Sequence, residues 1–151
     1  MADLNGLISV WGLKLRISQQ GNLVGSGNMI THPCVDATVT VADEDTNVRA
    51  ITIQLLDANG NDVDIATEVD VQIFLTNDRL AEVVTGGSTG IEIGTDGWLH
   101  TVTAKKRFIA TSEADGDIDL TWTDTGTEAA YIGIKLPNGN WVMGSQALTN
   151  A

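Results

Sequence analysis

The chain has 151 residues, which fits one domain or one domain with an arm. Its formal net charge of −12 and its pI near 4.2 argue against a nucleic-acid partner, because phosphate contacts need clusters of Lys and Arg. The single cysteine, Cys34, excludes an internal disulfide.

The charge is unevenly distributed along the chain. Residues 1–34 contain three charged side chains, Asp3, Lys14 and Arg16, which sum to +1. Residues 35–151 therefore carry −13, since +1 and −13 give the total of −12. The first segment is apolar, rich in Gly and Asn, and too short for a core of its own. We expect an N-terminal attachment arm (1–34) that another surface covers, followed by a β-sandwich domain (35–151).

The arm contains a clear strand pattern. In residues 13–17, Leu13, Leu15 and Ile17 alternate with Lys14 and Arg16, and this period of two predicts a strand. Residues 19–22 suit a turn, and Leu23 with Val24 suits the start of a return strand. We expect the edge of the strand at 13–17 to be free for pairing with a neighbouring sheet.

In the domain, short alternating segments are separated by turn signals about every ten residues. The inner faces are predicted to contain Ile51, Ile53 and Leu55; Val69, Val71, Ile73 and Leu75; Ile118, Leu120 and Trp122; and Ala130, Ile132, Ile134 and Leu136. Seven to nine short strands and no convincing amphipathic helix predict an all-β fold, an antiparallel β-sandwich. The Cys…Trp…Cys pattern of immunoglobulin domains is absent, so any immunoglobulin-like character is architectural.

Two acidic segments could each be a calcium site, or a solvated strand face and a turn. Asp117 and Asp119 share one strand face, which suits a bound cation or a solvated outer face. Residues 57–64 resemble a calcium loop, but Gly60 falls where it serves an Asn-Gly turn better than an EF-hand. His32 and Cys34 are too few for a structural zinc site. We expect no metal and no cofactor.

Catalytic residues are not evident. The two histidines, His32 and His100, stand in no Ser-His-Asp or Cys-His spacing, so we expect no enzyme. The basic cluster at residues 105–107 is expected to be a solvated strand end rather than a phosphate site. No secretory signal and no membrane span is expected.

The four tryptophans receive different interpretations. Trp122 alternates with core residues and is predicted to be buried. Trp98 and Trp141 each follow a turn, so they are expected either to cap the sandwich or to stack on a sugar. Trp11 lies in the arm and is the tryptophan most suited to burial against a partner, because Trp is common at interface anchors.

Four segments of the domain carry a family resemblance: residues 53–62, 93–97, 112–120 (SEADGDIDL) and 136–139. From Ile51 to the end, about two-thirds of the chain, the sequence resembles small tailed-bacteriophage virion proteins with an immunoglobulin-like β domain. The string at 112–120 is fairly specific, and the other three are turn signals common to many β proteins. The arm matches no family pattern.

The resemblance implies a virion structural protein, most simply a capsid decoration (cement) protein that is made in the host cytoplasm and binds the head exterior through its arm. Its implied partners are the major capsid protein and sister copies in a homotrimer, with no nucleic acid, no membrane and at most a weak glycan contact. Alternatives are a tail tube, collar or fibre-base protein, and a glycan-binding adhesion module. The expected partner-binding residues are Leu7, Ile8, Val10, Trp11, Leu13, Leu15 and Ile17.

Overall fold

A computed structural model describes residues 34–64, 68–77, 90–126, 129–144 and 147–149 in full, together with the backbone of four short strands in the arm. The described strands are β1 (Ile8–Val10), β2 (Leu13–Ile17), β3 (Leu23–Gly25), β4 (Asn28–Met29), β5 (Asp36–Val41), β6 (Val48–Leu56), β7 (Asp70–Thr76), β8 (Gly90–Ile93), β9 (Trp98–Thr103), β10 (Arg107–Thr111), β11 (Asp117–Thr123), β12 (Ala129–Lys135), β13 (Trp141–Met143) and β14 (Leu148–Thr149). The described part of the chain contains no helix, and so none that is long and apolar enough to cross a membrane.

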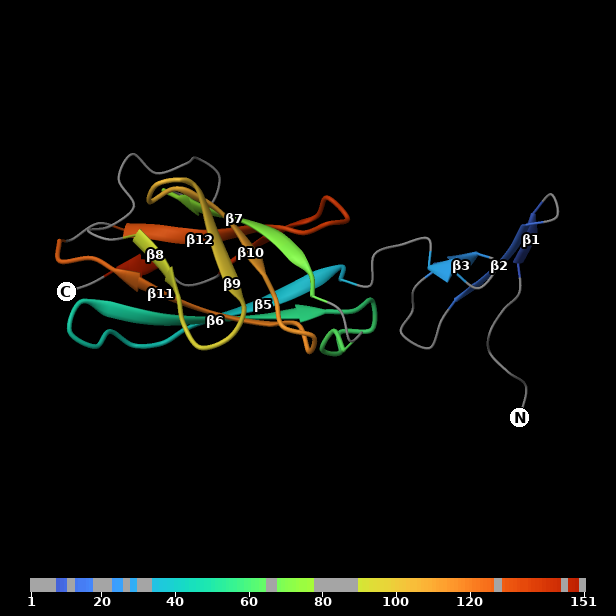
Figure 1. Cartoon of the computed structure of the whole chain (residues 1–151), viewed down its shortest axis with the longest axis horizontal. Helices are drawn as coiled ribbons and strands as arrows, with labels where there is room; N and C mark the ends of the chain where they lie inside the picture. Colours follow the sequence, from blue (N-terminus) through green and yellow to red (C-terminus); the bar gives the residue numbers. More distant parts are fainter. Residues whose placement is uncertain are drawn as a thin grey trace.

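The domain is an antiparallel β-sandwich, as the sequence predicts (Figure 1). The large sheet has the strand order β13-β12-β7-β10-β9, with β14 also paired to β12. The small sheet has the order β5-β6-β11-β8. Strands β1 to β4 pair in sequence order in a separate arm sheet.

The domain has ten described strands rather than the seven to nine expected. The difference lies partly at the C-terminus, where residues 141–149 contribute two short strands that both pair with β12. The predicted turns at Gly60 and at Gly139 are confirmed, while the turn expected at residues 19–22 lies outside the described residues. At Gly60 and Gly139, φ is +79° and +90°, values that glycine adopts without strain. Each glycine follows an Asn and closes a turn, with its N–H donated to the carbonyl oxygen of Asp57 or of Leu136.

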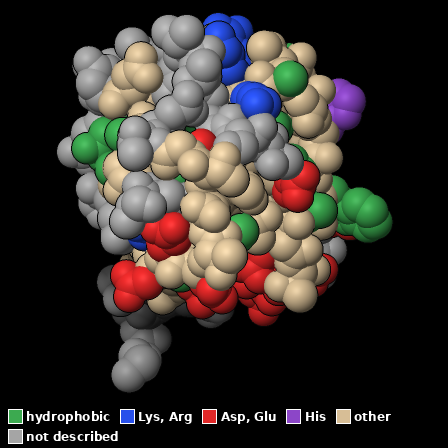
Figure 2. All heavy atoms as spheres, turned by 90° about the vertical axis from the view of Figure 1, so that its left-hand side faces the viewer, with side chains coloured by type: hydrophobic (Ala, Val, Ile, Leu, Met, Phe, Trp, Pro, Cys, Tyr) green, Lys and Arg blue, Asp and Glu red, His purple; other side chains and the backbone are tan. Residues whose placement is uncertain are grey.

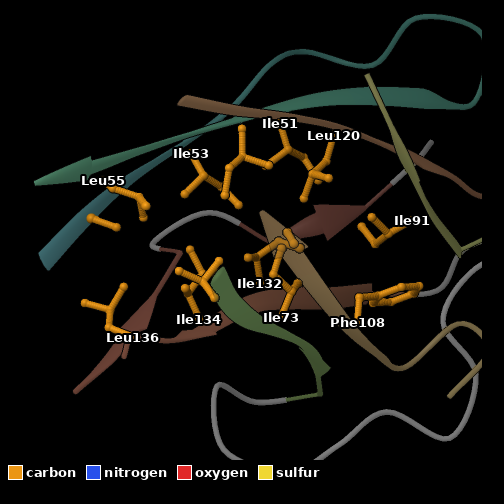
Figure 3. Packing of buried hydrophobic residues seen from close by; sticks show 14 of the residues in the cluster. Ile51, Ile53, Leu55, Ile73, Ile91, Phe108, Leu120, Ile132, Ile134 and Leu136 are labelled. Carbon is orange, nitrogen blue, oxygen red and sulfur yellow. The ribbon is translucent and has the colours of Figure 1, made fainter. Parts of the chain in front are cut away.

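The core lies between the two sheets, where the alternating positions of each sheet face the other. Ile51, Ile53 and Leu55 of β6 are at most 1% exposed, and Figure 3 shows them above Ile73 of β7 and Ile132 of β12. Trp122 is fully buried, as predicted. All the predicted inner-face residues are buried, because a period of two places each set on one side of its strand.

Cys34 belongs to this core although the sequence analysis assigns it to the end of the arm. Its side chain is 0% exposed and packs in the main hydrophobic cluster. The next residue, Val35, donates its N–H to the carbonyl oxygen of Leu56 at 2.9 Å. The domain therefore begins at Cys34, and a truncated chain without the arm should begin at residue 34.

Candidate partner-binding site

The register of the arm sheet brings apolar positions together. Ile8 lies opposite Leu15, and Val10 lies opposite Leu13, in the antiparallel pair β1–β2. Ile17 lies opposite Leu23 in the pair β2–β3. Directly opposed residues share a face of the sheet, as do alternate residues of one strand. One face, which we call the apolar arm face, therefore contains the positions Ile8, Val10, Leu13, Leu15, Ile17 and Leu23.

Five of the seven predicted partner-binding residues fall on the apolar arm face. The other two, Leu7 and Trp11, lie outside the described residues. Lys14 and Arg16 fall on the opposite face, where Lys14 is opposite Ser9 and Arg16 is opposite Val24. Leu23 is an addition: its place in a return strand was expected, but its face depends on the register across the turn, which the sequence leaves open.

The arm sheet corrects one expectation about mechanism. The strand at 13–17 was expected to present a free edge, whereas β2 pairs with β1 on one side and with β3 on the other. Both of its edges are therefore used within the chain. Backbone pairing with a neighbour would have to begin at β1 or β4, the outer strands of this sheet.

Trp98 and Trp141 do not cap the sandwich. They are 70% and 53% exposed, at the start of β9 and β13. Trp141 contacts Phe74, with ring centroids 5.0 Å apart and the planes tilted by 47°. The ammonium group of Lys135 lies 5.9 Å from the Trp141 ring centre. A capping role is excluded because both indoles lie largely in solvent.

The outer face of the large sheet is hollowed beside Lys135, the residue opposite Trp141. Asp70, Gln72, Ile109 and Lys135 help to line a shallow hollow of about 510 Å³, which extends to the turn after β12. A second hollow of about 260 Å³ shares Gln72 and Ile109 with it and reaches Phe74 and Arg107. The sequence gives little signal of this surface, because its residues come from strands β7, β9, β10 and β12, whose order in the sheet is not sequential.

Of the two acidic residues on β11, Asp119 accepts side-chain hydrogen bonds and Oδ1 of Asp117 accepts none. Asp119 accepts hydrogen bonds from the hydroxyls of Thr52 at 2.9 Å and Thr95 at 2.7 Å. The Oδ1 atom of Asp117 is buried and has no hydrogen-bond partner. Burial, followed by the neighbouring charge of Asp119, raises the pKa of Asp117. Within the fully described ranges, no three His, Cys, Asp or Glu side chains gather where they could hold a metal ion.

The loop at 57–64 is a turn held by its own first residue. Oδ1 of Asp57 accepts the backbone N–H groups of Asn59 and Asn61, at 2.8 and 3.0 Å. Burial alone would raise the pKa of Asp57, but these hydrogen bonds outweigh it and lower the pKa. The Asp57 carboxylate therefore stabilises the turn by accepting its backbone N–H groups. This favours the Asn-Gly turn interpretation over the calcium loop.

The remaining polar candidates lie at the hairpin of β9 and β10. His100 is on β9 and is exposed, while His32 lies outside the described residues. Lys105 and Lys106 occupy the turn between the two strands, and Arg107 begins β10 with its guanidinium 5.7 Å from the Phe74 ring centre. The cluster is thus a strand end, as expected.

Comparisons with known proteins identify no family for this chain. No known protein family matches the sequence, and no curated protein matches it. Among solved structures, the chain is similar to the crystal structure of a β-glucuronidase from Parabacteroides merdae, with a TM-score of 0.44 and 13% identity. That similarity covers 91% of this chain and 16% of the glucuronidase. The chain is an antiparallel β-sandwich protein.

Proposed function

We propose that this protein is a structural component of a tailed-phage virion, a capsid decoration protein with an immunoglobulin-like domain. The observation that carries the proposal is the apolar arm face, a row of aliphatic positions in a chain segment too short to bury them itself. We infer that a partner covers these positions, because apolar surface that a segment cannot bury itself is typical of interaction sites. The family resemblance of the domain supplies the choice of a phage shell as that partner.

In the proposed arrangement, the sandwich stands on the shell exterior and the arm lies on the capsid subunits. Burial of the apolar arm face supplies the main attraction, and β1 or β4 adds backbone pairing with a neighbouring sheet where one is available. The acidic domain keeps a densely covered particle soluble through repulsion between copies and particles. No catalytic step is part of this role.

The two faces of β2 provide a matched test. Leu13→Gln with Leu15→Gln changes the apolar arm face, and Lys14→Gln with Arg16→Gln changes the opposite face of the same strand. Binding to expanded, undecorated capsids should weaken about 100-fold for the leucine pair, since two buried leucines contribute about 3 kcal/mol together. The Lys14 and Arg16 pair should bind within a few-fold of the parent. Equal binding by both pairs would contradict the proposal, as would full binding by a chain that begins at residue 34.

The copy number per particle separates a shell protein from the tail alternatives. Hundreds of copies per virion, measured by quantitative gel, are expected for a protein that covers the head. A few tens or fewer would place the protein in a tail, collar or fibre base instead.

A second candidate, glycan binding, is favoured by the exposed ring of Trp141 beside the hollow that Gln72 and Asp70 line. Sugars stack on exposed indoles while neighbouring amides and carboxylates bind their hydroxyls. On a glycan array, Trp141→Ala should then abolish binding, whereas Trp98→Ala, outside the hollow, should retain it. No glycan bound by the parent protein would remove this candidate.

A further inference from the structure

Strand β9 is an outer strand with an unusual surface. In the described part of the chain it pairs with β10 on one side and with no strand on the other (Figure 1). An outer strand presents a row of backbone N–H and C=O groups, and proteins usually protect it with charged residues or proline. From residue 97 to residue 104, β9 and its flanks contain neither.

The strand also exposes large apolar side chains. Five large hydrophobic residues are clearly exposed among the described residues, and two of them lie on β9: Trp98 at 70% and Val102 at 56%. Ile109, at 37%, lies on the adjacent strand β10 directly opposite His100. Apolar exposure is therefore concentrated along one edge of the large sheet.

The charges at the two ends of β9 have opposite signs. Asp96 lies two residues before the strand, and Lys105, Lys106 and Arg107 follow it. Figure 2 shows one side of the molecule, where Lys and Arg side chains gather mainly at the top and Asp and Glu side chains gather in the lower half. The neutral middle of β9 is notable because the whole chain carries −12, so two copies repel over most other approaches.

We propose that two copies of this chain pair through β9, edge to edge and antiparallel, around a two-fold axis near His100. In this arrangement the two large sheets continue into each other. The acidic end of each β9 meets the basic end of the other, so that Asp96 lies near Lys105 of the second copy. A parallel pairing would bring like charges together. The same register sets Trp98 of one copy beside Val102 of the other, twice in the dimer.

The contact is expected to be weak in free solution. Thr101 pairs with Phe108 and Thr103 pairs with Arg107, so Val102 is the extra residue of a bulge on β9. The bulge interrupts regular backbone pairing at Val102, and six residues a side make a small interface. A shell that held copies side by side would raise their effective concentration and strengthen the pairing. A two-fold contact gives a dimer, in place of the homotrimer that the family resemblance implies.

The first test is the association state of the full-length protein without capsids, which is independent of the virion role. Sedimentation velocity from about 1 µM to 1 mM should show a reversible monomer–dimer equilibrium. Hydrogen exchange at the high concentration should show added protection of the β9 amides. A monomer throughout this range would overturn the proposal.

The second test places a charge on the strand. Val102→Lys should raise the dissociation constant of the dimer about tenfold or more, because a lysine on an edge strand blocks close pairing. Thr38→Lys is the matched control, since it adds the same charge at an exposed position of β5, the outer strand of the small sheet. A dimer that Val102→Lys leaves unchanged, or that both variants weaken equally, would overturn the proposal.

The third test checks the antiparallel orientation by exchange of charges. Asp96→Lys alone and Lys105→Glu alone should each weaken the dimer several-fold, because each sets like charges together at both ends. The combination of the two should restore it to within about twofold of the parent. If the double variant is no tighter than either single variant, Asp96 and Lys105 do not meet across the axis and the proposed arrangement is wrong.

Discussion

Asp117 and Asp119 lie two residues apart on the outer side of β11, yet only Asp119 has hydroxyl donors. Thr52 and Thr95 donate to Asp119 at 2.9 and 2.7 Å, whereas the Oδ1 atom of Asp117 is buried without a partner. The pKa of Asp117 is raised by burial and by Asp119, and also by Asp96 and Asp115. Asp119 therefore helps to hold the loop before β9, while ionised Asp117 destabilises the fold.

Asp117→Asn should accordingly stabilise the protein at neutral pH. A folded pKa above the usual 3.8 means that the stabilising protonated form is present below that value and is lost as pH rises through the folded pKa. The asparagine avoids this loss and relieves like-charge repulsion, so urea unfolding at pH 7 should show a gain of about 0.5 kcal/mol. The gain should disappear near pH 3.

Asp119→Asn is the matched control for that substitution. It removes the same charge, but it replaces a carboxylate that accepts two hydroxyl hydrogen bonds, so it should cost about 1 kcal/mol. An equal gain from both substitutions would mean that only net charge matters at this face.

Gly97, which leads into β9, should not tolerate a side chain. Its φ is +88°, and a Cβ at this position would lie 2.7 Å from the carbonyl oxygen of Thr111. Gly97→Ala should therefore cost more than about 2 kcal/mol, from backbone strain together with a contact that backbone atoms cannot easily relieve. Thermal or urea unfolding measures this cost.

Gly60→Ala separates the two contributions. Gly60 has a similar φ of +79°, but nothing lies within 4 Å of its would-be Cβ. This substitution should cost only about 1 kcal/mol, which is the strain of the left-handed conformation alone. If both alanines cost the same, the approach of Thr111 does not matter.

The two tryptophans of opposite exposure should respond differently to truncation. Trp122 is fully buried between the sheets, so Trp122→Ala should cost about 4 kcal/mol and should leave little folded protein. Trp98 is 70% exposed, and Trp98→Ala should change the stability of dilute protein by less than about 0.5 kcal/mol. A large loss from Trp98→Ala at low concentration would show packing within its own molecule.

The sequence predicted the inner faces because local alternation decides which side chains are buried. Val71, Ile73 and Leu75 needed no knowledge of neighbouring strands, since a period of two fixes their side of β7. Of the two interpretations of Trp98 and Trp141, the capping one was wrong, because exposure at the start of a strand depends on which strand ends beside it.

The arm shows the same division between local and long-range information. The strand at 13–17 and its return at Leu23 followed from alternation and a turn. The pairing of β1 with β2 was missed, because it depends on a register across residues whose pattern is not regular. Together with the pairing of β2 with β3, it occupies both edges of β2, so the apolar face is the surface of β2 that remains for a partner.

Cys34 should make the stability of the domain depend on pH in the alkaline range. Burial, and then the charge of Asp36, raise the pKa of its thiol from 9.0 to about 11. Above pH 9 the unfolded chain releases the thiol proton while the folded chain retains it, so stability that is fully present below pH 9 falls until about pH 11. The loss over this window should be about 2 kcal/mol.

Cys34→Ala has no thiol, so its unfolding free energy should lack this decline, although its overall stability is lower because a small cavity forms in the core. Urea unfolding of both proteins at pH 8, 9, 10 and 11 measures the difference. Parallel curves for the two proteins would show that the thiol titrates alike in the folded and unfolded chains.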